Sequence, residues 1–217
     1  MIEFDIEKYL NSLSDKVEKI NVSNKKLKYL PELSRFKCLK YLKCSNNQLT
    51  SLPILPDNLE CLDCHSNNLT ILPILKKKLI SLDCSYNIIT SLPVLNKNLI
   101  ELFCANNKLT SLPVLNKELK ILYCISNDLT SFPVLNENLK HCYYSNNPIS
   151  SIIYNNNFNI FKKNIKIWNN FRYLYYCLKY RKKFLKIMEP IIKKRYHPSY
   201  LYNLTEEDDL DEKLEKW

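Results

Sequence analysis

Apolar residues recur at a fixed interval through about two thirds of the chain. The shared pattern is L-x-x-L-x-C-S-x-N-x-L-T-S-L-P-V-L-N-x-N, and its copies follow one another every 20 residues. A variant copy begins at Val17, and the regular copies begin at Leu39, Leu59, Leu79, Leu99, Leu119 and Leu139. A period of this length indicates a repeat architecture, in which each copy buries its apolar side against its neighbours.

Each copy predicts a short strand followed by an extended return segment. In L-x-x-L-x-C the first, fourth and sixth positions point inward, so the third and fifth positions point outward. The return segment carries a proline, which breaks a helix and favours extended or polyproline geometry. These prolines are Pro53, Pro73, Pro93, Pro113 and Pro133.

The pattern resembles the leucine-rich repeat family, whose signature is L-x-x-L-x-L-x-x-N-x-L. Its short, proline-containing form is similar to the repeats of secreted bacterial effectors. The resemblance implies a β-rich solenoid with parallel strands on a concave face and an extended convex side. It also implies a ladder of buried amides that bond to the backbone of adjacent turns, at Asn47, Asn67, Asn87, Asn107, Asn127 and Asn147.

Both ends of the chain depart from the repeat. Residues 1–16 place Ile2, Ile6, Leu10 and Leu13 on one stripe, which predicts an amphipathic helix that caps the first turn. We therefore divide the chain into an N-terminal helical cap (1–16), the solenoid (17–153) and a C-terminal helical segment (154–217). The apolar stripe of that last segment comprises Phe161, Ile165, Trp168, Phe171, Leu174, Leu178 and Leu185.

The composition adds two constraints to this picture. The chain contains no glycine, so we expect turns with positive φ to use Asn or Asp. The start, MIEFDIEKYL, has acidic residues where a signal peptide needs positive charge, and no long uncharged apolar run follows. We therefore expect an intracellular protein that does not span a membrane.

Five of the nine cysteines occupy the sixth position of successive copies, and a metal ladder, a disulfide stack or a core column would each use that spacing. Stacked side chains point in one direction, so neither a disulfide nor four zinc ligands can converge. We interpret the column as reduced core thiols and expect neither a metal nor a cofactor. In the C-x-x-C at Cys61, only the second cysteine belongs to this column, which is Cys44, Cys64, Cys84, Cys104 and Cys124.

The outward positions change character along the predicted concave face, from basic through acidic to aromatic and apolar. Exposed aromatic residues grouped in this way are typical of a protein-binding patch. An alternative is that the C-terminal helix covers them through Trp168 or Phe171. The predicted partner-binding residues are Asp63, Asp83, Glu101, Phe103, Ile121, Tyr123, His141 and Tyr143.

We predict a non-enzymatic module that binds an unknown partner protein on this face. No catalytic grouping is apparent, since the three histidines lie far apart in sequence and a P-loop requires glycine. Some bacterial effectors with similar repeats carry a ubiquitin ligase domain with a nucleophilic cysteine. The less favoured alternative of such an enzyme would rest on Cys177, in a segment too short for that domain.

Nucleic-acid binding is the other alternative. Residues 155–203 hold twelve Lys or Arg and one acid, a net charge of +11, interleaved with aromatic residues. We favour a solvated basic helix, or one that pairs with the acidic tail from Leu204.

The C-terminal stretch resembles a segment of large AT-rich DNA virus proteins such as those of mimiviruses. This resemblance implies a viral source, and for the solenoid it implies action on host proteins. It rests on Glu189, Pro190, Tyr196, His197, Pro198, Leu201, Leu210, Asp211 and Trp217.

Overall fold

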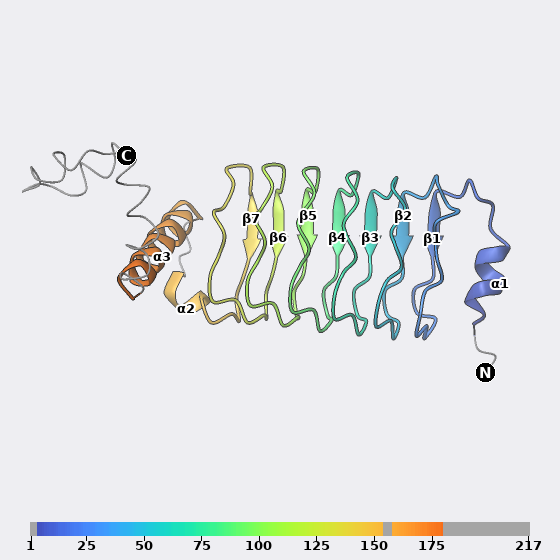
Figure 1. Ribbon diagram of the computed structural model, residues 1–217, viewed down its shortest axis with the longest axis horizontal. Helices are drawn as coiled ribbons and strands as arrows, with labels where there is room; N and C mark the ends of the chain where they lie inside the picture. The colour runs from blue at the N-terminus through green and yellow to red at the C-terminus, as the bar shows by residue number, and fades with distance from the viewer. Residues whose placement is uncertain (1–3, 154–157, 180–217) are drawn as a thin grey trace, which may run out of the picture. The chain divides into compact units, whose positions relative to one another are not determined.

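The computed structural model describes residues 4–153 and 158–179. The chain divides into two compact units, Met1–Asn169 and Asn170–Trp217, each described by itself. The described part of the first unit contains one sheet of seven parallel strands in chain order (Figure 1). The strands are β1 (Lys19–Asn21), β2 (Tyr41–Lys43), β3 (Cys61–Asp63), β4 (Ser81–Asp83), β5 (Glu101–Phe103), β6 (Ile121–Tyr123) and β7 (His141–Tyr143).

The strands stack in perfect repeat register. Tyr41 pairs with Cys61 and Cys61 pairs with Ser81, so equivalent positions of the repeat lie side by side. In β1 to β6 the central residue is buried and both neighbours are at least partly exposed. This alternation confirms that the third and fifth positions of each copy form an outer strand face.

The return segments are extended, as the prolines predict. Residues 51–56, 71–76, 91–96, 111–116 and 131–136 contain neither helix nor strand. Side-chain amides join successive return segments: Asn116 Nδ2 donates to Asn96 O at 2.8 Å and to Leu99 O at 3.0 Å. The same bonds recur one coil later from Asn136. The sequence analysis missed this second asparagine ladder.

The cysteine column lies in the core. Cys44, Cys64, Cys84, Cys104 and Cys124 are each 0% exposed, and the eight described cysteines are free thiols. Burial raises the pKa of Cys44 to about 12 and raises the pKa values of the other four above the usual range. Cys61, in contrast, is partly exposed on β3. The column consists of protonated, apolar-like side chains, which confirms the core interpretation.

The predicted asparagine ladder satisfies backbone groups that have no strand partner. Asn87 Nδ2 donates to the carbonyls of Cys64 and Cys84, both at 3.1 Å, and its Oδ1 accepts from Leu69 N at 2.9 Å. One side chain thus joins two coils. Equivalent bonds come from Asn47, Asn67, Asn107, Asn127 and Asn147.

The residue before each ladder asparagine has a positive φ. Asn occupies this position at 46, 106 and 146, but Ser66, Tyr86 and Ser126 adopt φ values of 53°, 55° and 53°. The expectation that Asn or Asp would fill such turns is therefore wrong for half of these coils. The stacked strands and ladder bonds on either side fix the turn, so the fold imposes a left-handed conformation on residues that disfavour it.

The N-terminal helix is shorter than the sequence predicts. α1 (Ile6–Asn11) begins after Asp5, whose carboxylate accepts from Lys8 N at 2.9 Å, and Ser12 caps its end. Ile6 and Leu10 are buried, whereas Leu13 packs on the core from beyond the helix. Ile2 lies outside the described residues.

After β7, the residues that the structure describes form two helices, α2 (Ser150–Ile153) and α3 (Phe158–Lys179). Phe161 stacks on Tyr144 with a centroid distance of 4.4 Å and meets Phe132 edge-on. Asn169 Nδ2 donates to Phe132 O at 3.0 Å. Residues 158–169 therefore close the last coil of the core.

The residues of the predicted apolar stripe of α3 differ in burial. Phe161 and Ile165 are buried and Trp168 packs against the core, but Phe171 is 60% exposed. In the second unit, the described residues are the end of α3, 170–179. The predictions on residues 180–217, including the virus-like segment and the acidic tail, lie outside the described residues. Among the described helices, none combines the length and apolar character that a membrane crossing needs.

Candidate functional site

The outer strand face consists of two columns of side chains. One column holds the third positions and the other the fifth positions of the strands, each beside its equivalent on the next strand. All eight predicted partner-binding residues lie on this face. Asp63, Asp83, Glu101, Phe103, Ile121 and Tyr123 are partly exposed, and His141 and Tyr143 are exposed. Because the strands are in register, the residues form two neighbouring groups, one acidic and one aromatic.

The aromatic strip consists of Phe103, Tyr123 and Tyr143, the fifth positions of β5, β6 and β7. Ring centroids are 5.1 Å apart between Phe103 and Tyr123 and 4.3 Å apart between Tyr123 and Tyr143. The His141 ring lies nearly parallel to Tyr143, with a centroid distance of 6.5 Å. The distances of 5.1 and 6.5 Å lie in the range of favourable aromatic pairs, and the Tyr123 and Tyr143 rings stack still more closely.

The strip keeps both apolar and polar character. Tyr143 is 44% exposed, so the end of the strip is open to solvent. A hydrogen bond between the two phenol groups raises the pKa of Tyr123, and its partial burial adds to this effect. The phenol of Tyr123 therefore stays neutral at physiological pH. The strip offers a rigid apolar surface with hydroxyl groups at its edge.

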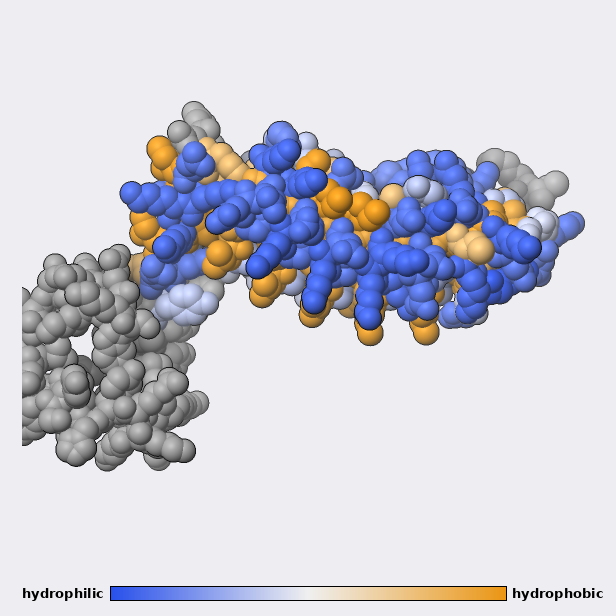
Figure 2. Space-filling view, turned by 90° about the horizontal axis from the view of Figure 1, so that it is seen from above, coloured by the Kyte–Doolittle hydropathy of each residue, from blue (hydrophilic) through white to orange (hydrophobic). Residues whose placement is uncertain are grey.

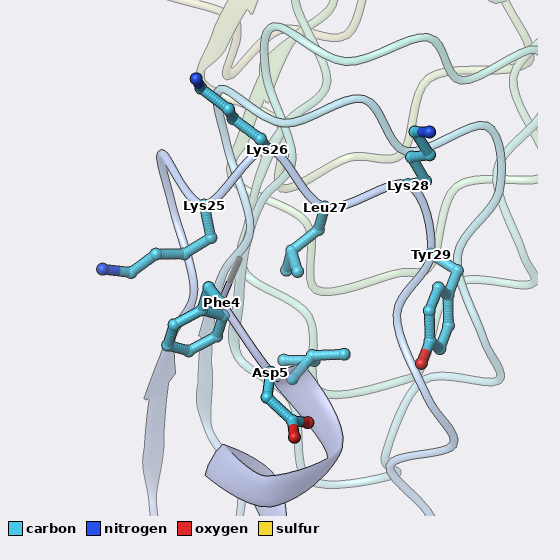
Figure 3. A pocket seen from close by; sticks show the side chains of 8 residues that line it. Phe4, Asp5, Lys25, Lys26, Leu27, Lys28 and Tyr29 are labelled. Carbon is cyan, nitrogen blue, oxygen red and sulfur yellow. The ribbon is translucent and has the colours of Figure 1, made fainter. Parts of the chain in front are cut away.

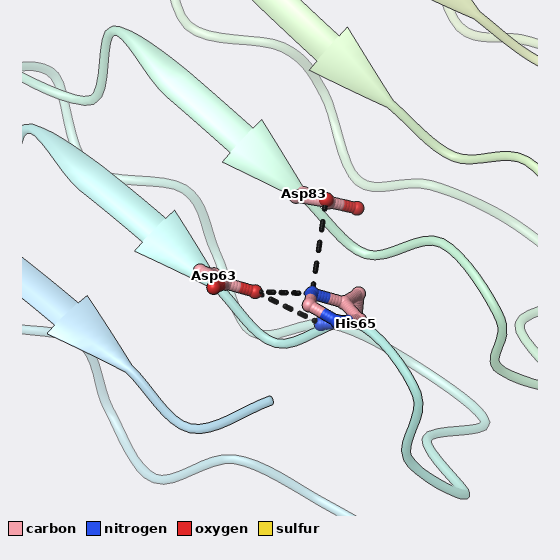
Figure 4. A group of neighbouring side chains, drawn as sticks. All are labelled: Asp63, His65 and Asp83. Carbon is pink, nitrogen blue, oxygen red and sulfur yellow. Dashed lines mark hydrogen bonds and ion pairs between the residues drawn. The ribbon is translucent and has the colours of Figure 1, made fainter. Parts of the chain in front are cut away.

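The acidic group begins beside the strip. Ser81 Oγ donates to Glu101 Oε2 at 2.9 Å, which orients this carboxylate on β5. Asp63 and Asp83 are direct partners in the sheet register. His65, from the loop after β3, places Nδ1 2.7 Å from Asp63 Oδ1 and 3.9 Å from Asp83 Oδ2 (Figure 4).

His65 is the residue of this group that the sequence analysis missed. It occupies the seventh position of its copy, which the strand alternation does not assign to the outer face. The signal that could have identified it is the pair of acids in register at Asp63 and Asp83, next to the only seventh-position histidine of the repeats.

Phe161 of α3 packs on residues outside the aromatic strip. Phe161 packs on Phe132 and Tyr144, which belong to a return segment and to the core column position. Lys162 Nζ donates to Asn136 O at 3.1 Å, again on the return side. Phe171 is 60% exposed. The contacts of Phe161 and Lys162 place the first part of α3, residues 158–169, on the end of the core.

Two other surface features carry apolar or basic side chains. The return segments expose one or two aliphatic side chains per coil, and the surface view is mostly hydrophilic with separate apolar groups (Figure 2). Single aliphatic side chains spread among polar residues offer less contact area than stacked rings. The exposed aliphatic residues of the return segments are Ile54, Ile71, Ile74, Val94, Val114 and Val134.

The second feature is a pocket of about 380 Å³ between the start of α1 and the first coil (Figure 3). Lys25, Lys26 and Lys28 line it together with Phe4 and Tyr29. The Lys25 and Lys26 side chains point in different directions, and Lys25 Nζ lies 5.1 Å from the Phe4 ring centroid. Their ammonium groups do not converge on one ligand position.

Known structures share this architecture. No protein-family model and no curated protein sequence matches the chain. YopM from Yersinia enterocolitica WA-314 is 34% identical, with a TM-score of 0.60 over 65% of this chain and 31% of that one. A Shigella effector LRR domain is 31% identical, with a TM-score of 0.60 over 68% and 67% of the two chains. YopM from Yersinia pestis is 29% identical, with a TM-score of 0.52 over 61% and 44%.

The seven in-register strands, the asparagine ladder and these similarities define a leucine-rich repeat solenoid. The chain belongs to the leucine-rich repeat family, and its repeats are similar to those of bacterial effectors. It spans less than a third of the length of the Yersinia enterocolitica YopM chain. The similarity to effector repeat domains supports a protein–protein interaction module.

Proposed function

We propose that the chain is a non-enzymatic module that binds a partner protein on its concave strand face. The aromatic strip supplies the apolar anchors, and Ile121 and His141 border it. Glu101, Asp83 and Asp63 supply a charged rim. The observation that carries the proposal is the strip itself: three rings from adjacent strands that contact one another and stay at least partly open to solvent.

The energetics of such a surface suit a binding site. Stacked rings on short strands lose little conformational freedom when a partner binds, so the cost of ordering the surface is small. Aromatic anchors surrounded by polar residues contribute most of the binding energy in many interfaces, ~2 kcal/mol or more each. The acids beside the strip favour a partner segment with apolar side chains followed by basic residues.

The test replaces Phe103 and Tyr123 by Ala and compares partner capture and thermal stability with wild type. We expect loss of capture with only a small change in melting temperature, because both side chains lie on the outer face. The matched control replaces Val94 and Val114, which are exposed on the return side, by Ala. Unchanged capture by the strip variant, together with a large loss of stability, would refute the proposal.

The alternative of nucleic-acid binding keeps its basis in the charge of residues 155–203. Within the described part, Lys163 and Lys166 are exposed on α3, whereas Lys162 bonds to the last coil. Binding through this segment would weaken steeply with salt and on neutralisation of the basic residues at 179–186. The viral source, the intracellular location and the division at residues 16 and 153 stay predictions.

A further inference from the structure

Three side chains with metal-ligating atoms converge where β3 and β4 end. Asp63 and Asp83 are the last residues of their strands, and His65 follows β3 by two residues. One ligand atom from each residue lies within 4.8 Å of the other two (Figure 4). The side chains of Asp63, His65 and Asp83 are 27%, 32% and 35% exposed, so an ion can reach them from solvent.

The distances suit a small divalent ion after a minor side-chain adjustment. Ligands at about 2.0–2.2 Å from one ion are roughly 3–4 Å apart. The separation of 3.9 Å between His65 Nδ1 and Asp83 Oδ2 already lies in this range. The 2.7 Å separation between Nδ1 and Asp63 Oδ1 is that of a hydrogen bond, so an ion would take the place of the shared proton and widen this pair.

Neighbouring groups orient all three side chains. Ser45 Oγ donates to Asp63 Oδ2 at 3.2 Å, and Ser85 N donates to Asp83 Oδ1 at 3.0 Å. The opposite oxygen of each carboxylate is left to face His65. Asn46 Nδ2 lies 3.3 Å from His65 Nε2. With this amide flipped, its oxygen would accept a hydrogen bond from Nε2–H when Nδ1 binds an ion.

The charge of the group favours a cation. Two carboxylates face each other directly across neighbouring strands, an arrangement that is destabilising without a countercharge. Within the described residues, the ion pairs of Asp63 and Asp83 involve His65 and no lysine or arginine. A divalent cation would neutralise both acids and bind the imidazole as well.

We propose that Asp63, His65 and Asp83 bind one divalent transition-metal ion of the zinc type on the concave face. Imidazole nitrogen with two carboxylates suits zinc, cobalt, nickel or iron better than calcium or magnesium, which prefer oxygen ligands. Three protein ligands leave coordination positions for water or for a partner side chain. Asp63 and Asp83 also belong to the charged rim of the proposed partner surface, but metal binding by this group does not depend on the aromatic strip.

The test titrates the full-length reduced protein with CoCl₂, followed by visible absorption, and with ZnCl₂, followed by equilibrium dialysis and metal analysis. We expect one saturable equivalent without an absorption band from thiolate–cobalt bonds. His65→Ala and Asp83→Asn should each weaken binding at least about tenfold, and Asn46→Ala should weaken it less. Circular dichroism checks that each variant remains folded.

Control variants separate this site from the other potential ligands. Cys61→Ser and the double variant His141→Asn/His197→Asn should bind as wild type does. In the double variant His65 is the one histidine that remains of the three in the sequence. Substoichiometric Co²⁺ should therefore broaden its imidazole proton signals in the NMR spectrum. Absence of saturable binding, wild-type affinity in His65→Ala, loss in Cys61→Ser, or unbroadened His65 signals would each overturn the proposal.

Discussion

At the residue scale, the same repeat position imposes the same environment whatever side chain occupies it. The sixth position is sealed from solvent, and cysteine there acts as a small apolar residue with a pKa raised by burial. The eighth position has a positive φ, and serine and tyrosine adopt it as asparagine does. The first feature followed from the pattern of the sequence. The second did not, because strain imposed by neighbouring coils leaves no trace in composition.

The buried thiols predict a loss of stability at alkaline pH. The pKa of Cys44 rises from 9.0 to about 12 on folding, so above pH 9 the unfolded chain loses this proton first and folding becomes less favourable. Below pH 9 the thiol is protonated in both the folded and the unfolded chain, so it makes stability independent of pH there. Each pH unit between 9 and 12 costs about 1.4 kcal/mol for this thiol.

Cys44→Val removes this effect while nearly keeping the volume. Urea unfolding should therefore give similar stabilities for wild type and Cys44→Val at pH 7. At pH 10 the variant should lose less stability than wild type, by about 1.4 kcal/mol. An equal loss in both proteins would show that the thiol ionises freely in the folded state.

The positive φ of Tyr86 predicts an easy gain in stability. Tyrosine in a left-handed conformation costs roughly 1 kcal/mol more than asparagine, which the coils at 46, 106 and 146 use. Tyr86→Asn should raise the unfolding free energy by about this amount, and Asn106→Tyr should lower it. Chemical denaturation of both variants checks the sign, and opposite signs would contradict the strain argument.

At the scale of the elements, each strand is three residues long and depends on its neighbours. The repeat period, the inward positions and the extended return segments were predictable, because they need only alternation and proline chemistry. The extent of α1 was not, since Leu13 packs on the core without being helical. The exposure of Phe171 was also missed, because the stripe of α3 continues in sequence past the residues that close the last coil.

The asparagine ladder is the element that joins successive coils at their turns. Asn87→Ala would leave Leu69 N without its buried acceptor. The carbonyls of Cys64 and Cys84 would each lose one amide donor and keep a second, from Asn67 and Asn107. We expect a loss of about 3 kcal/mol in unfolding free energy, since each unsatisfied buried group costs about 1–3 kcal/mol. Asn98→Ala is the control: its amide bonds one carbonyl, Lys77 O, at the exposed surface, and its loss should be below about 1 kcal/mol. Comparable losses in both variants would contradict the role of the ladder.

At the scale of the whole molecule, the repeat places side chains 20 residues apart in the sequence next to one another. This is why the candidate surface was predictable: once the period is known, Phe103, Tyr123 and Tyr143 must be neighbours. The ring geometry and the position of His65 were not predictable, because they depend on side-chain conformations and on a loop. Similarity to effector repeat domains gives the architecture, and the surface of this chain gives the proposed specificity.

The central claim is that a partner protein binds at the aromatic strip, and site-specific photo-crosslinking tests it most directly. A photoreactive phenylalanine analogue replaces Tyr123 on the strand face or, as the matched control, Val114 on the return side of the neighbouring coil. Cells that contain the partner are irradiated, and the crosslinked product is identified by mass spectrometry. The account predicts one discrete crosslinked protein from position 123 and none from position 114. Excess unmodified chain should suppress the crosslink from position 123 by competing for the partner. Crosslinking from position 114 alone, or from neither position while partner capture is intact, would contradict it.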